Sequence, residues 1–293
     1  MKNFGQVLTA MVTPFHEDFS VNHQAAAKLA KYLVDNGNDG LVVAGSTGES
    51  ATMTSEEKLK LFVTVLDAVG DRATVIAGTG SNDTRASIEM TRQAEKLGVH
   101  GAMLVGPYYN KPPQEGFYQH FKAIADSTAL PLIVYNVPGR TGSNILPPTI
   151  ARLAEIKNIV AVKEASGSLD QASEIVRTTS PDFLVYSGDD SLTLPILAVG
   201  GAGIISVAAH AVGKQMKEMI SAFMAGDSKR AREIHLQLMP FFKAIFVTTN
   251  PIPIKTAVNL LGLQAGPLRL PLIPPTAAET DLLKKTMQDL ALI

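Results

Sequence analysis

Short apolar runs recur along the chain and alternate with longer stretches that carry helix signals. The runs lie at residues 7–13, 40–44, 74–77, 102–105, 131–135, 158–163, 183–186 and 203–207. Strands that are buried on both faces form continuous apolar runs, and strands that alternate with helices form parallel sheets. Eight such strand–helix units predict an α/β fold, a closed (β/α)8 TIM barrel of about 250 residues or slightly less.

A doubly wound sheet is the weaker alternative. No Gly-x-Gly-x-x-Gly follows the first apolar run, and the chain has neither a P-loop nor another dinucleotide fingerprint. The pattern therefore favours the barrel.

Polar residues mark where several helices should begin. Thr54 with Glu57, and Thr276 with Glu279, have the spacing of a capping box. The helix after Thr54 should turn one apolar stripe towards the core, made of Leu59, Phe62, Val63 and Leu66.

The pattern changes after the eighth run. The chain then consists of helical segments that we expect to be broken at Pro240, at 250–253 and at 270–275. We therefore expect a barrel domain over residues 1–225 and a small C-terminal helical domain over residues 226–293.

Composition narrows the class of protein. The chain has 293 residues, with 26 Lys plus Arg against 27 Asp plus Glu and a formal net charge of −1 at pH 7. This balance argues against nucleic acid as a partner. The chain has no cysteine, which excludes disulfides, thiolate metal sites and a cysteine nucleophile. The histidines show no metal-ligand spacing, so we expect no metal site.

Membrane association is not expected. No apolar run reaches the ~20 residues of a membrane-spanning helix. The amino end, residues 1–6, lacks an apolar leader segment. We expect a soluble, cytoplasmic protein.

The sixth apolar run ends in a lysine, Lys163. An ammonium at the end of an apolar strand is costly unless it is paired or used. Burial lowers the pKa of a lysine, and a neutral amine is a nucleophile towards ketones. The alternative is a lysine that simply reaches solvent beyond the end of the strand.

Other reactive residues follow the carboxyl ends of the predicted strands, where TIM barrels build their active sites. Ser46 and Thr47 follow the second run, Tyr109 follows the fourth, and Tyr135 ends the fifth, beside Lys163 at one rim. This convergence predicts a Schiff-base site in which the Lys163 amine attacks a ketone. The Tyr135 hydroxyl, assisted by Ser46 and Tyr109, would move the protons. The alternative for Tyr135 is a tyrosine that only packs within its strand.

Two features suit carboxylates. The 45–48 turn can present backbone N–H groups to a carboxylate, with the Thr47 hydroxyl as a further donor, and a plain strand-to-helix turn is the alternative. Arg140 can hold a second carboxylate through two parallel hydrogen bonds, although most loop arginines are only solvated. Residues 203–205 can form a close apolar wall or an ordinary core strand.

Four motifs carry a resemblance to a known family. They are residues 40–50 (GLVVAGSTGES), 106–112 (GPYYNKP), 135–141 (YNVPGRT) and 162–165 (VKEA). In this order they resemble the pyruvate-dependent class I aldolase superfamily, that of N-acetylneuraminate lyase, and within it the dihydrodipicolinate synthase family. The resemblance covers nearly the whole chain. The arginine of the third motif favours the synthases over their sugar-acid relatives.

The resemblance implies a site for two substrates. Lys163 would form the Schiff base with pyruvate, Thr47 and Ile205 would hold pyruvate, and Gly188 would lie at the pocket edge. Arg140 would bind the carboxylate of L-aspartate 4-semialdehyde. The implied product is 4-hydroxy-tetrahydrodipicolinate, on the route to diaminopimelate and lysine.

The resemblance also implies a proton relay and an assembly. Tyr135 would pass protons through Ser46 to Tyr109, which would reach in from a neighbouring subunit of a homotetramer built from two tight dimers. Ser46 stands where the family usually has threonine, so the hydroxyl is kept and the methyl that fixes its rotamer is lost. We expect a working relay. The resemblance implies no metal and no organic cofactor.

Two other functions would use the same residues. A sister aldolase, such as an N-acetylneuraminate or 2-keto-3-deoxy-sugar-acid lyase, would share Lys163 and Tyr135 and differ in its second substrate. A non-catalytic keto-acid-binding sensor would also fit the barrel, although the intact Lys163, Tyr135 and Tyr109 argue against it.

Feedback regulation is expected to be weak. Family members that lysine inhibits use a pocket at a dimer interface. The residues that match this pocket are Ser50, Ala51, Asn82 and Tyr108. Those that replace its two histidines and a glutamate are Ser55, Lys58 and Ala86. Losing the carboxylate that would pair with the effector's amine, and adding the charge of a lysine, predicts poor or absent inhibition by lysine.

Overall fold

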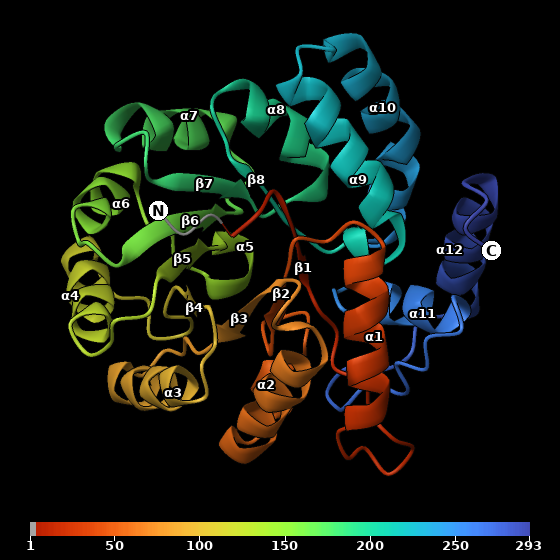
Figure 1. Cartoon of the computed structure of the whole chain (residues 1–293), viewed down its shortest axis with the longest axis horizontal. Coiled ribbons are helices and arrows are strands. Elements are labelled where there is room, and N and C mark those ends of the chain that lie inside the picture. The colour runs from red at the N-terminus through yellow and green to blue at the C-terminus, as the bar shows by residue number, and fades with distance from the viewer. Residues whose placement is uncertain (1–3) are drawn as a thin grey trace. The chain divides into compact units, whose positions relative to one another are not determined.

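The computed structural model describes residues 4–293, in which eight parallel strands form a closed barrel (Figure 1). The strands follow one another around the barrel in chain order. Their bounds are β1 Val7–Ala10, β2 Gly40–Val43, β3 Thr74–Gly78, β4 Gly101–Val105, β5 Leu132–Asn136, β6 Ile159–Glu164, β7 Leu184–Ser187 and β8 Gly203–Ser206. The predicted TIM barrel is confirmed.

Burial on both faces explains the continuous apolar runs. Every residue of β1, β2, β5 and β8 is buried, including those that point in opposite directions along each strand. Each fully buried aliphatic side chain contributes about 1.5–3 kcal/mol to folding. The first run was predicted to continue to residue 13, but β1 ends at Ala10. Met11, Val12 and Thr13 are buried without being strand residues, so their pattern reports burial rather than pairing.

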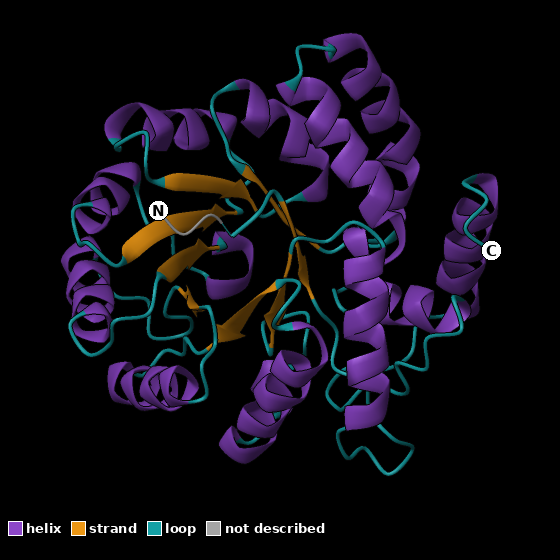
Figure 2. Ribbon diagram, in the orientation of Figure 1, coloured by secondary structure: helices purple, strands orange, loops and turns teal. Residues whose placement is uncertain are grey.

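Helices alternate with the strands along the chain (Figure 2). The helices are α1 His23–Asp35, α2 Ser55–Val69, α3 Thr84–Lys96, α4 Gln114–Ala125, α5 Pro138–Thr141, α6 Pro147–Ala154, α7 Leu169–Thr178, α8 Thr193–Ala198, α9 Ala209–Met224, α10 Ser228–Ala244, α11 Ile252–Leu260 and α12 Ala277–Asp289. Two short 3₁₀ helices are η1 Ser50–Thr52 and η2 Asp190–Leu192. Within residues 4–293, none of the helices is both long and apolar enough to cross a membrane.

Both predicted capping boxes are confirmed. The Glu57 N–H donates to the Thr54 hydroxyl over 3.2 Å, and the Thr54 N–H donates to the Glu57 carboxylate over 2.9 Å. Thr276 and Glu279 do the same for α12. Each box satisfies two backbone donors that the first helical turn leaves open.

Two expectations about helices were wrong. The apolar residues of α2 fit more than one stripe, and packing against α1 selects a different one from that predicted. The buried residues of this helix are Leu61, Phe62, Val65 and Val69, whereas Val63 is exposed. Pro240 lies inside α10 and does not break it. The proline removes one backbone hydrogen bond, while buried Leu238, Phe241 and Phe242 hold the helix by packing.

The chain divides into two compact units. The first comprises Met1–Gln6 and Ile76–Ile205, and the second comprises Val7–Val75 and Ser206–Ile293. In the first unit, α4 packs against α3 and α6, and α6 packs against α7. In the second, α1 packs against α2, α9 against α10, and α12 against α10 and α11. The domain boundary expected between residues 225 and 226 stays a prediction, and residues 1–3 of its first domain lie outside the described residues.

Candidate active site

Lys163 is buried near the carboxyl end of β6 in the first unit. It is the last residue but one of its strand, and its Cα pairs with those of Tyr135 on β5 and Tyr186 on β7. Only 3 % of Lys163 is exposed, and its Nζ lies 4.3 Å from the centroid of the Tyr135 ring. The structure therefore places the amine over the aromatic face of the tyrosine that the sequence put beside it.

The surroundings of Lys163 favour its neutral form. Burial lowers the pKa of Lys163 from 10.5 to about 7. The carboxylate of buried Asp190, in η2, opposes this shift in pKa, and the charge of Arg140 adds to it. A pKa near 7 leaves a large share of the amine uncharged at neutral pH, as a nucleophile towards a ketone requires.

Tyr135 keeps its proton in the same environment. The side chain is 6 % exposed, and burial raises the pKa of Tyr135 to about 12, with the Arg140 charge acting in the opposite direction. The hydroxyl is therefore a neutral group that can donate one hydrogen and accept another. Such a group suits proton transfer beside the amine.

Gly188 leaves room for the lysine. It follows β7, and its N–H donates to the Glu164 carbonyl over 2.7 Å. A Cβ at this position would lie 3.1 Å from Lys163 Cε and 2.6 Å from the Ala165 Cβ. A side chain at this position would crowd Lys163 and Ala165. The place of Gly188 at the pocket edge stays a prediction. Ile205, the predicted apolar contact, is fully buried in β8.

The other two predicted residues of the first unit are exposed. Arg140 lies in the four-residue helix α5. It is close enough for its charge to lower the pKa of both Lys163 and Tyr135. Tyr109 is 89 % exposed and has a left-handed backbone with a φ of 72°. Its exposure contrasts with the burial of Lys163 and Tyr135.

A partly buried polar network ties the ends of β5 and β6 together. The Glu164 carboxylate accepts hydrogen bonds from Asn136 Nδ2 at 3.1 Å, Gln171 Nε2 at 3.2 Å and the Ser166 N–H at 2.7 Å. Asn144 accepts from Asn136 Nδ2 at 2.8 Å and donates to Gln171 Oε1 at 2.9 Å. Because side chains alternate along a strand, Glu164 faces away from the side that Lys163 occupies. The network thus holds the backbone that carries Tyr135, Lys163 and the loop after Arg140.

In the second unit, the 45–48 turn follows β2. The Gly48 N–H donates to the Gly45 carbonyl at 3.0 Å, and the Glu49 N–H donates to the Ser46 carbonyl at 3.2 Å. Within residues 4–293, the N–H groups of Ser46 and Thr47 donate no hydrogen bond. Two such neighbouring donors suit a carboxylate. The Thr47 hydroxyl oxygen accepts from Asn250 Nδ2 at 2.9 Å, which leaves the hydroxyl hydrogen able to donate to a ligand.

The sequence did not assign a role to several buried polar residues. Asp190 follows the seventh apolar run, and its carboxylate acts on Lys163. Lys255 Nζ donates to Glu49 Oε1 at 2.7 Å. Lys255 is the one charged residue of α11, so the sequence could have indicated a buried lysine, but it does not indicate which residue pairs with it. Asn250 gave no comparable signal.

The chain is similar to known proteins over its full length. The model of the dihydrodipicolinate synthetase family matches residues 3–290. A relative from Moorella thermoacetica named 4-hydroxy-tetrahydrodipicolinate synthase is 60 % identical over 290 residues, which cover 99 % of both chains. The crystal structure of a dihydrodipicolinate synthase from Cyanidioschyzon merolae with lysine bound has a TM-score of 0.98 and 49 % identity, again covering 99 % of both chains. A monomeric variant of a dihydrodipicolinate synthase has a TM-score of 0.97 and 43 % identity, covering 99 % of this chain and 98 % of its own.

The pKa of Lys163 predicts a pH dependence for imine formation with a small keto acid. The amine is an unreactive ammonium below its pKa, so the rate of trapping by cyanoborohydride should rise with pH through about 7 and level off above. Asp190→Asn removes the charge that raises this pKa, so the midpoint should move to lower pH. Asp126→Asn, at an exposed carboxylate paired with Lys122, is the matched control and should leave the midpoint in place. A midpoint near the ordinary lysine value of 10.5 would contradict the assignment.

Proposed function

Because the chain belongs to the dihydrodipicolinate synthetase family, we propose that it condenses pyruvate with L-aspartate 4-semialdehyde to give 4-hydroxy-tetrahydrodipicolinate and water, in diaminopimelate and lysine biosynthesis. The observation that carries the proposal is the buried amine of Lys163, 4.3 Å from the ring of Tyr135. Full-length relatives at 56–60 % identity carry the name of this activity.

The first step is covalent capture of pyruvate. The neutral Lys163 amine adds to the ketone carbon, and the adjacent Tyr135 hydroxyl moves a proton from the nitrogen to the oxygen to give a carbinolamine. The carbinolamine hydroxyl then takes up one further proton, supplied by solvent, and leaves as water, which gives a protonated imine. The 45–48 turn binds the pyruvate carboxylate through the N–H groups of Ser46 and Thr47 and the Thr47 hydroxyl. Ile205 contacts the pyruvate methyl group, and Gly188 borders the pocket.

The second step forms the carbon–carbon bond. The imine loses a proton from its methyl carbon and becomes an enamine, which attacks the aldehyde carbon of the semialdehyde. The aldehyde oxygen takes up a proton and becomes the hydroxyl of the product. The amino group of the semialdehyde then attacks the imine carbon, the bond to Lys163 breaks, and the cyclic product leaves. Arg140 binds the carboxylate of the semialdehyde during this sequence.

The proton relay and the assembly complete the proposal. Tyr135 passes protons through Ser46 to Tyr109 of a neighbouring subunit in a homotetramer. The exposure of Tyr109 in a single chain supports this arrangement, because an exposed aromatic side chain is available to a second subunit. The covalent imine supplies the electron sink, so the proposed reaction uses neither a metal nor an organic cofactor.

Borohydride reduction in the presence of pyruvate tests the nucleophile. The parent chain should gain one reduced pyruvate per subunit, and peptide mass mapping should place it on Lys163. Lys163→Ala should abolish the adduct and lower kcat by roughly 10⁴-fold or more, because the covalent route is lost. Lys157→Ala, at an exposed lysine just before β6, is the matched control. Full activity of Lys163→Ala would end the proposal.

Substitution of Arg140 separates this function from that of a sister aldolase. Arg140→Ala removes the partner of the second carboxylate and should raise the KM for L-aspartate 4-semialdehyde by roughly 10- to 100-fold. Trapping of pyruvate on Lys163 should persist. Arg152→Ala, at an exposed arginine paired with Glu115, should change neither quantity. Turnover of the semialdehyde that is indifferent to Arg140 would favour the sister aldolase.

Feedback inhibition by lysine should be weak. Ala86 and Lys58 replace a carboxylate and a histidine of the effector pocket, so the amine of a bound lysine would lack a partner and meet a like charge. In an assay coupled to the next reductase of the pathway, about 1 mM lysine should leave most of the activity. Ala86→Glu with Lys58→His should restore sensitivity. Clear inhibition of the parent by sub-millimolar lysine would contradict this prediction.

A further inference from the structure

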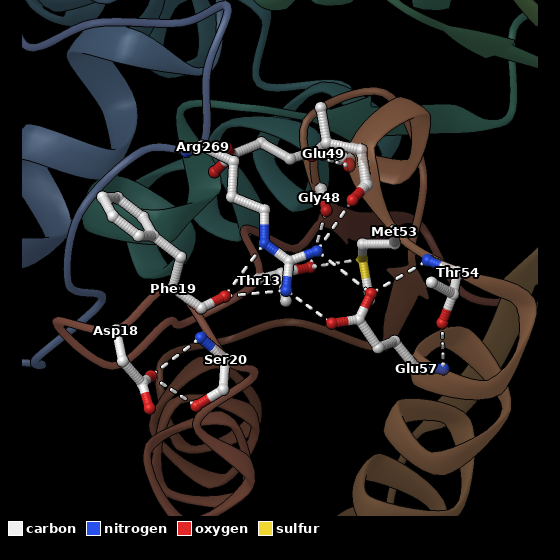
Figure 3. A network of polar contacts seen from close by, with 11 residues as sticks. Thr13, Asp18, Phe19, Ser20, Gly48, Glu49, Met53, Thr54, Glu57 and Arg269 are labelled. Carbon is white, nitrogen blue, oxygen red and sulfur yellow. Dashed lines mark hydrogen bonds and ion pairs between the residues drawn. The ribbon is translucent and has the colours of Figure 1, made fainter.

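A buried ion pair lies next to the 45–48 turn in the second unit. Lys255 Nζ donates to Glu49 Oε1 at 2.7 Å, and each side chain is 1 % exposed. The other carboxylate oxygen of Glu49 accepts the backbone N–H of Arg269 at 2.9 Å (Figure 3). Both cations stand over the Phe15 ring, with Lys255 Nζ at 4.0 Å and the Arg269 guanidinium at 4.3 Å from its centroid. Glu49 is therefore held from two sides by residues more than 200 positions away along the chain.

The backbone on both sides of the turn is strained. Ala44, just before it, has a φ of 52°, and Glu49, just after it, has a φ of 55° and a ψ of 34°. Neither residue is glycine, and the left-handed region is unfavourable for residues with a Cβ. Such conformations persist only where the surroundings fix them. The fixed side chain of Glu49 supplies this restraint at one end of the turn, and the Thr13 hydroxyl donates to the Gly48 carbonyl at 2.7 Å (Figure 3).

The side chain of Arg269 is held in place by hydrogen bonds to other residues. All five of its guanidinium N–H donors are used (Figure 3). They reach the Phe19 carbonyl, at 3.0 Å and 2.7 Å, the Thr52 carbonyl at 2.7 Å, and both carboxylate oxygens of Glu57. The backbone N–H that binds Glu49 thus belongs to a residue anchored to the loop before α1, to η1 and to the cap of α2.

We infer that Lys255 is a positioning residue, which acts through Glu49 to hold the 45–48 turn in the shape that binds the pyruvate carboxylate. Lys255 does not touch the substrate. It fixes Glu49, which fixes the backbone that aims the N–H groups of Ser46 and Thr47. The inference rests on the proposed function, because it names what the turn must hold.

Stability alone does not account for the pair. Removing two charges from water is expensive, and replacing a buried ion pair by apolar residues of similar volume is often neutral or stabilising. An apolar pair would fill the same space without fixing the direction of a carboxylate. The ion pair therefore serves to fix the direction of the Glu49 carboxylate near the end of β2.

The test compares three variants with the parent chain. Lys255→Ala leaves Glu49 without its cation, and the double variant Glu49→Gln/Lys255→Met removes both charges while keeping the volume. Each should lower the second-order rate of pyruvate trapping on Lys163 by roughly 10- to 100-fold, because the carboxylate cradle is displaced. The KM for L-aspartate 4-semialdehyde should stay within about twofold of the parent value. Lys217→Ala is the matched control, because Lys217 pairs with Asp39 at the opposite end of β2 at 2.6 Å.

Chemical rescue adds a readout that a purely structural role would not move. Lys255 borders a cavity of about 670 Å³, also lined by Phe15, Asn22, Asn259 and Leu268. In Lys255→Ala, ethylammonium or propylammonium can enter the space left by the side chain and pair with Glu49. Either should restore the trapping rate at least in part at a constant melting temperature. Tetramethylammonium, which has no N–H donor, should have no effect at the same ionic strength.

The outcomes separate the inference from the proposed function. A folded double variant that traps pyruvate at the parent rate would overturn the inference, as would an equal loss in Lys217→Ala. If the double variant does not fold, the test uses the single variant Glu49→Gln, which removes the charge of the carboxylate, together with the amine rescue of Lys255→Ala. A parent-like rate of pyruvate trapping in Glu49→Gln, or no rescue by the amines, would then overturn the inference. If the parent chain fails to trap pyruvate on Lys163, the proposed function fails instead.

Discussion

The desolvation of one ammonium group governs this site. A lysine in water has a pKa of 10.5 and is almost wholly charged at neutral pH, where it cannot attack a carbonyl. Burial near the carboxyl end of the apolar strand β6 lowers the pKa of Lys163 to about 7. The apolar strand, the neutral ring of Tyr135 and the missing side chain of Gly188 all serve this condition.

Two charged residues shift the pKa of Lys163 in opposite directions. Asp190 favours the ammonium, and Arg140 disfavours it. Asp190 is buried and fixed in η2, whereas Arg140 is exposed on α5. An exposed cation is screened by solvent, so its effect on the lysine is the weaker of the two. In the proposed function this guanidinium binds a substrate carboxylate, after which its effect on the pKa of Lys163 would fall further. Under that proposal, substrate binding and the charge state of the nucleophile are coupled.

Much of the fold could be predicted because its signals are local. Continuous apolar runs report strands buried on both faces, and the Thr54–Glu57 and Thr276–Glu279 spacings report helix starts within four residues. The strand order follows from the connections, so the sequence alone predicted that Tyr135 and Lys163 are neighbours, and the two residues pair in the barrel. The stripe of α2 could not, because several stripes fit its sequence and only its packing partner selects one. Pro240 was misjudged for the same reason, since tertiary packing outweighs one missing hydrogen bond.

The polar residues around the site could be predicted only in part. A hydroxyl or amine at the end of a strand stands out, and Ser46, Thr47, Tyr135 and Lys163 were predicted as site residues in this way. Asp190 lies just beyond a strand end as well, yet nothing in its sequence distinguishes a buried aspartate from an exposed one. Glu49 and Lys255 are 206 residues apart, and no local pattern records a pairing at that distance. Their partnership depends on the tertiary fold, and burial of both side chains is what makes it specific.

Ser46 is also affected by its surroundings, since the resemblance to the family leads one to expect threonine at this position. The lost methyl group would have restricted χ1, so the serine hydroxyl has more rotamers open to it. Its backbone has no such freedom, because left-handed residues flank the turn and Glu49 is anchored by Lys255 and Arg269. The remaining freedom is a single torsion angle, which a hydrogen bond to a substrate or to a second hydroxyl is sufficient to fix.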